Sequence, residues 1–84
     1  MMKPTIHSNG TSRQELLDQV LEVGHKIREA MAALARATPN GRDYYPQDPG
    51  AIKIALEEHN VRATKLQEVL NDMQALAEHI CDAA

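Results

Sequence analysis

Two long stretches of the chain repeat apolar residues at alternating spacings of three and four. This period places apolar side chains on one side of an α-helix. Ser12 and Glu15 form an S-x-x-E capping box, and Pro39 cannot continue a helix, so we predict helix one over residues 12–38. Its central row is Leu17, Val20, Gly24, Ile27, Met31 and Leu34, and its flanking row is Leu16, Val23, Ala30 and Ala37.

The second stretch predicts a longer helix over residues 49–82. Asp48 can serve as its N-cap, and Pro49 suits the first helical position because no amide is needed there. The pattern favours one helix face, which we call the seam, for packing against the other helix. Two polar residues, His59 and Arg62, interrupt the apolar row of this seam. The seam is Ile52, Ala55, His59, Arg62, Leu66, Val69, Met73, Leu76 and Ile80, and the flanking row is Leu56, Ala63, Leu70 and Ala77.

These elements predict an all-α fold, an antiparallel two-helix hairpin that forms a single domain over residues 1–84. An N-terminal arm covers residues 1–11, and a long loop with an Asn-Gly turn and both tyrosines covers 39–48. The C-terminal turns with Leu76, Ile80 and Cys81 extend past helix one. They need cover from the arm around Ile6 or from another subunit.

Each predicted helix has a wider apolar face than one partner helix can cover, which indicates a homo-oligomer, a dimer or higher. At 84 residues the chain has a small core of its own, and its one cysteine cannot close an internal disulfide. Cys81 is interpreted as a small core residue. His7 and His79 are interpreted as surface residues without metal-ligand spacing, and Glu22 with His25 as part of a solvated face. We expect no metal and no cofactor.

The charge and hydropathy of the chain argue against two classes of partner, nucleic acid and membrane. A formal net charge of -3, with both signs mixed along the helices, argues against nucleic acid as a partner. No stretch approaches the roughly 20 apolar residues that span a bilayer, and the N-terminus has no apolar signal region. We therefore expect a cytoplasmic protein with no membrane partner.

Seven polar or aromatic residues are expected to gather at the loop end of the hairpin. Arginines, aromatic rings and amide or carboxylate groups together suit a nucleotide-like ligand. The alternative is structural: Arg62 pairs with Asp43 or Glu58, His59 is a hydrogen-bonded boundary residue, and the tyrosines close the bundle. A second anion site at the start of helix one competes with the cap for the same amides. The seven candidates are Asn40, Arg42, Asp43, Tyr44, Tyr45, His59 and Arg62.

Two motifs of the chain resemble a family of small phage and prophage proteins. They are Ile6-His-Ser-Asn-Gly-Thr-Ser12 and Pro39-Asn-Gly-Arg-Asp-Tyr-Tyr-Pro-Gln47, and the likeness extends from about Ile6 to Ile80. Small oligomeric helical phage proteins are in turn similar, as a class, to the sponge proteins that capture cyclic or ADP-ribose-type nucleotide signals of CBASS and Thoeris defence systems. This similarity implies a non-enzymatic, phage-encoded protein that sequesters such a signal and so inhibits anti-phage defence.

Two other functions compete with that expectation. The spare apolar face could instead dock on a host or phage protein, which would make the chain a protein-interaction module. A small hydrolase of nucleotide signals that uses His59 and Asp43 is a third hypothesis. The sequence contains no nucleophile with a positioned base, which favours a binding protein over an enzyme.

Overall fold

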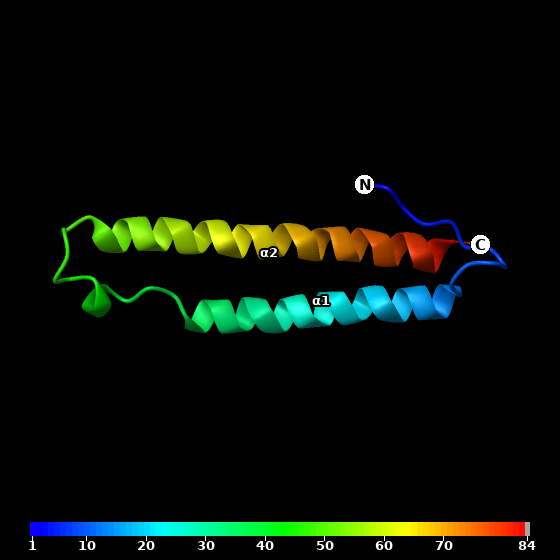
Figure 1. Ribbon diagram of the computed structural model, residues 1–84, viewed down its shortest axis with the longest axis horizontal. Coiled ribbons are helices and arrows are strands. Elements are labelled where there is room, and N and C mark those ends of the chain that lie inside the picture. Colours follow the sequence, from blue (N-terminus) through cyan, green and yellow to red (C-terminus); the bar gives the residue numbers. More distant parts are fainter. Residues whose placement is uncertain (84) are drawn as a thin grey trace.

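The chain folds into an elongated hairpin of two helices, and its computed structural model describes residues 1–83. The order of elements is α1 (Arg13–Arg36), the short 3-10 helix η1 (Gly41–Asp43) and α2 (Ala51–Asp82). α1 and α2 lie side by side and antiparallel, and the loop with η1 joins them at one end (Figure 1). The hairpin measures 62 × 20 × 17 Å. The all-α hairpin predicted from the sequence is confirmed.

The first helix begins at the cap that the sequence predicts. The Ser12 hydroxyl accepts a hydrogen bond from the Glu15 amide at 3.2 Å, which satisfies one of the free amides of the first turn. The helix ends at Arg36, two residues before the predicted end. There the Thr38 hydroxyl donates to the Ala35 carbonyl at 2.6 Å, and Pro39 follows. A side-chain bond to the last turn thus replaces the next turn of helix.

The second helix begins later than predicted, and the predicted Asp48 cap is wrong. α2 starts at Ala51, and Gly50 occupies the N-cap position without a side-chain hydrogen bond. The backbone carbonyl of Asp48 accepts from the Ala51 amide at 2.9 Å. A backbone turn at residues 48–51 therefore begins α2, in place of the predicted cap by the Asp48 carboxylate and the predicted first helical position of Pro49.

The seam of α2 differs by one row from the predicted seam. Arg62 and Val69 are exposed, whereas Leu70 is only 5% exposed. The apolar stripe of α2 is three rows wide, and the sequence pattern alone does not tell which two rows face α1. The residues that face α1 follow a strict heptad: Ile52, Leu56, His59, Ala63, Leu66, Leu70, Met73, Ala77 and Ile80.

The central row of α1 is confirmed as its seam. None of its residues is exposed, whereas Val23, Ala30 and Ala37 of the flanking row are exposed in the hairpin. The buried Gly24 lies opposite Leu70. A Cβ built on this glycine would stand 3.7 Å from the Leu70 Cδ1 atom, which is ordinary van der Waals contact.

The predicted overhang of the C-terminal turns is wrong. Arg13 at the start of α1 reaches Ala83, whereas the end of α1 meets His59, so α2 extends past α1 at the loop end instead (Figure 1).

The N-terminal arm covers the C-terminal turns of α2, one of the two solutions that the sequence left open. The arm runs back beside the C-terminal turns (Figure 1), and His79 Nε2 is hydrogen-bonded to the Pro4 carbonyl at 2.7 Å. Ile80 is fully buried. His79 is thus a partly buried anchor and not the surface residue that we expected.

Two further contacts define this end of the hairpin. The Arg13 guanidinium donates to the Ala83 carbonyl, so the beginning of α1 is tied to the end of the chain segment that the structure describes. Cys81 is exposed and free, so its interpretation as a core residue is wrong. The heptad explains the error, because position 81 follows the seam residue Ile80 and turns away from α1.

Gly24→Ala tests the packing at the centre of the seam. Alanine fits without a clash and removes the entropic cost of glycine inside a helix, so the free energy of unfolding should rise by about 1 kcal/mol. Chemical denaturation measures it. Gly41→Ala, which lies outside the α-helices in open space, is the control and should change stability by less than about 0.5 kcal/mol. A loss of stability in Gly24→Ala would contradict this packing.

Candidate functional site

A groove of about 360 Å³ opens where the loop meets the beginning of α2. We call it the loop-end groove. The loop contributes Pro39, Tyr44 and Gln47, and α2 contributes Ala51, Ile54, Ala55, Glu58 and Arg62. Small-molecule pockets range from roughly 300 to 1,000 Å³, so the groove could hold a small ligand. It combines an aromatic ring, an apolar floor and one charge of each sign.

The fold of the loop separates the two tyrosines. The Asn40 side chain accepts from the Arg42 amide at 2.9 Å, and the Gly41 carbonyl accepts from the amides of Tyr44 and Tyr45 at 3.1 and 3.0 Å. These bonds build the turn of η1 and fix the direction of the chain after it. Tyr44 is half-buried in the wall of the groove, whereas Tyr45 is 83% exposed and does not line it.

The charged pair in the groove is weakly held. Arg62 Nη2 lies 3.9 Å from Glu58 Oε2, one helical turn earlier, and both side chains are about 60% exposed (61% and 60%). Exposed pairs of this kind contribute little, typically 0.2–1 kcal/mol, so a doubly charged oxyanion could displace the carboxylate from the guanidinium. The expected structural alternative, a pair between Arg62 and Glu58, is therefore observed, and it leaves Arg62 available.

His59 belongs to the helix seam and not to the groove. It is 7% exposed, and its Nε2 lies 3.2 Å from the Thr38 hydroxyl. That hydroxyl has one proton and donates it to the Ala35 carbonyl, so the His59 nitrogen must carry its own proton and donate to the Thr38 oxygen. His59 thus joins the end of α1 to α2 through a chain of two hydrogen bonds.

The structure brings together two of the seven predicted site residues. Tyr44 and Arg62 line one groove, and Asn40 shapes the loop beside it. Arg42, Asp43 and Tyr45 are exposed in the loop and outside the lining. Sequence reasoning placed Glu58 only as a partner of Arg62 and did not predict Gln47 or Ile54. The spacing of four that links Ile54, Glu58 and Arg62 is the signal that could have found them, because it puts them on one side of α2.

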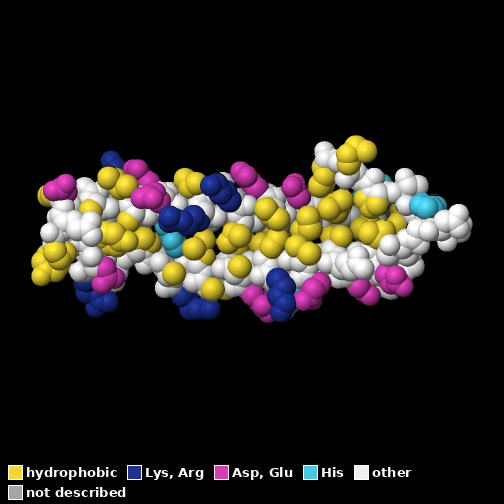
Figure 2. Space-filling model, in the orientation of Figure 1, with side chains coloured by type: hydrophobic (Ala, Val, Ile, Leu, Met, Phe, Trp, Pro, Cys, Tyr) yellow, Lys and Arg dark blue, Asp and Glu magenta, His cyan; other side chains and the backbone are white. Residues whose placement is uncertain are grey.

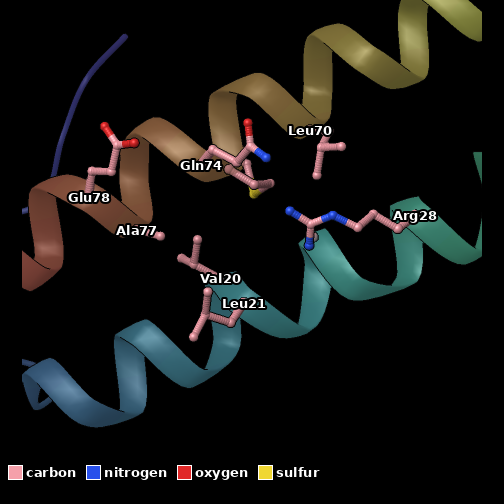
Figure 3. Close-up of a pocket in the computed structure, with 9 residues that line it drawn as sticks. Val20, Leu21, Arg28, Leu70, Gln74, Ala77 and Glu78 are labelled. Atoms are coloured by element: carbon pink, nitrogen blue, oxygen red, sulfur yellow. The ribbon is translucent and has the colours of Figure 1, made fainter.

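A second groove, of about 400 Å³, lies halfway along the hairpin on the opposite side. Figure 3 shows Arg28 of α1 reaching toward Leu70 and Gln74 of α2, with Glu78 farther along the rim. The space exists because Gly24 has no side chain, and a Cβ there would stand 3.8 Å from Arg28 Nη1. Arg28 therefore covers a gap in the seam with its long side chain.

Glu22 and His25 lie on a solvated face of α1, as the sequence indicated. His25 Nε2 pairs with Glu29 at 3.0 Å, and Lys26 lies 3.9 Å from Glu22, all on exposed side chains. No group of three or more potential metal ligands occurs within residues 1–83. At the start of α1 the Ser12 cap occupies the Glu15 amide, which leaves that turn with less capacity for an anion.

Comparison with known proteins gives no match to a family model, a curated relative or a solved structure. Neither helix in the described part of the chain has the length and apolar content needed to cross a membrane.

Thr38→Val tests the structural role of His59. The substitution keeps the shape of the side chain and leaves the nearly buried His59 N–H without an acceptor, so the free energy of unfolding should fall by about 1–2 kcal/mol. Thermal and urea denaturation give the value. Thr64→Val, at an exposed position on α2, should stay within about 0.5 kcal/mol of the parent. Equal changes in the free energy of unfolding at the two positions would mean that the Thr38–His59 hydrogen bond does not stabilise the fold.

Proposed function

We propose that the protein is a non-enzymatic binding protein that holds a nucleotide-type ligand in the loop-end groove. The observation that carries this proposal is the meeting of Tyr44 and Arg62, predicted together from the sequence, in one cavity of suitable volume. A base and a phosphate require these two groups, an aromatic face for stacking and a guanidinium for a bidentate ion pair.

The remaining lining residues suit the other parts of such a ligand. Gln47 offers an amide to a base edge, and Glu58, once released from Arg62, can accept from a ribose hydroxyl or a base amino group. Ile54 and Ala55 supply the apolar floor under a ring. Arg42, exposed in the adjacent loop, can approach a second phosphate. His59 has a positioning role, because its bond to Thr38 holds the end of α1 beside the loop.

The resemblance to small phage proteins gives this binding a role. In the proposal the protein is phage-encoded, acts in the cytoplasm of the infected cell, and sequesters a cyclic nucleotide or an ADP-ribose derivative before the host effector binds it. Sequestration requires tight binding without turnover. The loop-end groove suits that task, because Glu58 is its one carboxylate and its lining includes no serine, threonine, cysteine or histidine.

A second candidate function is a protein-interaction module, and a specific observation favours it. Val23 and Val69 are each 44% exposed on the hairpin, so an apolar surface is open along its length. The row of Leu56 and Leu70, which the sequence assigned to such a surface, packs instead against α1. Docking of another protein would therefore depend on Val23 and Val69.

Isothermal titration against a panel of cyclic dinucleotides, ADP-ribose and cyclic ADP-ribose tests the ligand proposal. We expect saturable binding of at least one member. Tyr44→Ala and Arg62→Ala should each weaken it by about tenfold or more, the loss that follows when a stacking ring or a charge-assisted bond is removed.

Matched variants separate the groove from the loop in general. Tyr45→Ala removes the neighbouring ring, which lies outside the groove, and Arg36→Ala removes an exposed arginine at the end of α1. Both should bind within about twofold of the parent, a difference too small to indicate a lost contact. No binding of any panel member by the folded protein, or equal losses in Tyr44→Ala and Tyr45→Ala, would count against the proposal.

A further inference from the structure

One side of the hairpin carries a continuous apolar surface, which we call the apolar face. On α1 it consists of the row one residue before the seam: Leu16, Val23, Ala30 and Ala37. On α2 the equivalent row is Ala55, Arg62, Val69 and Leu76. Because the helices are antiparallel, rows that precede the seam by the same step lie on the same side of the hairpin. Figure 2 shows this side, with a band of hydrophobic side chains along the line between the helices.

The opposite side of the hairpin differs in character. There the rows that follow the seam carry Leu21, Arg28 and Ala35 on α1 and Lys53, Asn60, Gln67 and Gln74 on α2. On α2 this side is polar from residue 53 to residue 74, whereas on α1 it includes Leu21, which is 52% exposed. The apolar face has one polar residue, Arg62, whose aliphatic stem can pack while its guanidinium stays solvated. The apolar face is therefore the more continuously apolar of the two sides.

The hairpin exposes more surface than a compact chain of its mass, and this excess can be compared with the area that a protein interface buries. A compact chain of 9.3 kDa exposes about 5,000 Å², whereas this hairpin exposes 6261 Å². The excess of about 1,300 Å² is larger than the roughly 800 Å² that each partner contributes to a standard protein interface. The hairpin as a whole thus exposes more surface beyond that of a compact chain than one standard interface buries on each partner.

The sizes of the side chains on the apolar face change along its length. Near the termini the two rows present Leu16 and Leu76, and near the loop they present Ala37 and Ala55. Well-packed helical layers place large residues opposite small ones. The face is therefore complementary to its own copy when the copy is reversed end for end.

We infer that a second copy of this chain covers the apolar face, with the two loops at opposite ends of a four-helix bundle. In this arrangement α1 packs on α1 of the second copy, so Leu16 lies over Ala37 and Val23 over Ala30. α2 packs on α2 in the same way. Within one hairpin Thr38 meets His59 and Arg13 meets Ala83, so the same two-fold axis places Val69 beside its own copy and Leu76 over the stem of Arg62.

The other two-fold arrangement, with both loops at the same end, packs less evenly. It would gather four leucines at the terminal end and four alanines at the loop end. The helices would then be held apart at one end and leave a void at the other, and voids of that size are costly. Reversal of one copy keeps each layer at a similar volume.

The reversed copy also completes the loop-end groove, a consequence that rests on the proposed function. Ala55 and Arg62 belong both to the groove and to the apolar face. Leu76 of the second copy would roof the groove over the stem of Arg62, and its Arg13 would lie near Asn40 at the groove mouth. Each dimer would have two sites, and each site would use both chains.

Val69→Glu, compared with Val61→Glu, tests the face itself in the absence of ligand. Val69 lies on the apolar face and Val61 on the outer side of α2, with exposed fractions of 44% and 53%. In sedimentation equilibrium the parent and Val61→Glu should be dimers. Val69→Glu should dissociate at least 100-fold more readily, as a helical monomer or an unfolded chain. A dimer unaffected by Val69→Glu would overturn the inference.

Cross-linking tests the direction of the second copy. In a Cys81→Ser background, Leu16→Cys and Ala37→Cys chains are mixed, refolded together and treated with a thiol cross-linker of about 10 Å, close to the distance between packed helices. The mixture should give a covalent heterodimer, and neither chain should cross-link alone. With the loops at the same end, Leu16 and Ala37 would be about 31 Å apart along the axis.

Each result of the cross-linking supports or overturns the reversed arrangement. Cross-linking of Leu16→Cys chains to one another would place the loops together and overturn the reversed arrangement, as would a folded dimer that gives no heterodimer. Leu76→Cys mixed with Arg62→Cys repeats the test at a second layer, in case Leu16→Cys impairs folding; with the loops at the same end these two positions would be about 21 Å apart along the axis. A ligand-free dimer with the predicted cross-links would stand even if no nucleotide binds, so failure of the interface and failure of the proposed ligand are distinguishable.

Discussion

The width of the apolar stripe on each helix is the constraint on which the rest of this structure depends. Two packed helices cover two rows of side chains on each other, and here each helix has a third row. Leu70 and Ile80 are the only apolar side chains that the hairpin buries almost completely within residues 1–83. The core of one hairpin is therefore thin, and the third rows hold the additional apolar area that folding can bury.

The heptad spacing and the caps were enough to predict the fold, but not which rows pair. Ser12 with Glu15, and the proline at position 39, marked the ends of α1 correctly to within two residues. On α2 the row of Leu70 is wholly apolar whereas the row of Val69 contains Arg62, so the sequence favours the Leu70 row without fixing how either row meets α1. The choice depends on the opposing surface, where Gly24 leaves space for the Leu70 side chain. Such complementarity exists only between two helices and not within one sequence.

The sequence predicted where the candidate site lies better than it predicted which residues line it. The sequence indicated that the loop and the beginning of α2 meet, and Tyr44 and Arg62 do line one groove. It could not separate Tyr44 from Tyr45, because the turn of η1, held by Gly41 and Asn40, decides which ring faces inward. For His59 the sequence left two roles open, a ligand contact and a hydrogen-bonded boundary residue, and the structure shows the hydrogen bond. A histidine in a seam can face a ligand or a partner helix, and the Thr38 hydroxyl decided between them.

Dependence of thermal stability on protein concentration tests most directly whether the third rows are covered by a second copy. If folding and association are coupled, the melting temperature followed by circular dichroism should rise steadily over a concentration range of about 100-fold, because dimerisation stabilises the folded state by mass action. A melting temperature that stays constant over that range, in a protein that sediments as a folded monomer, would contradict the account.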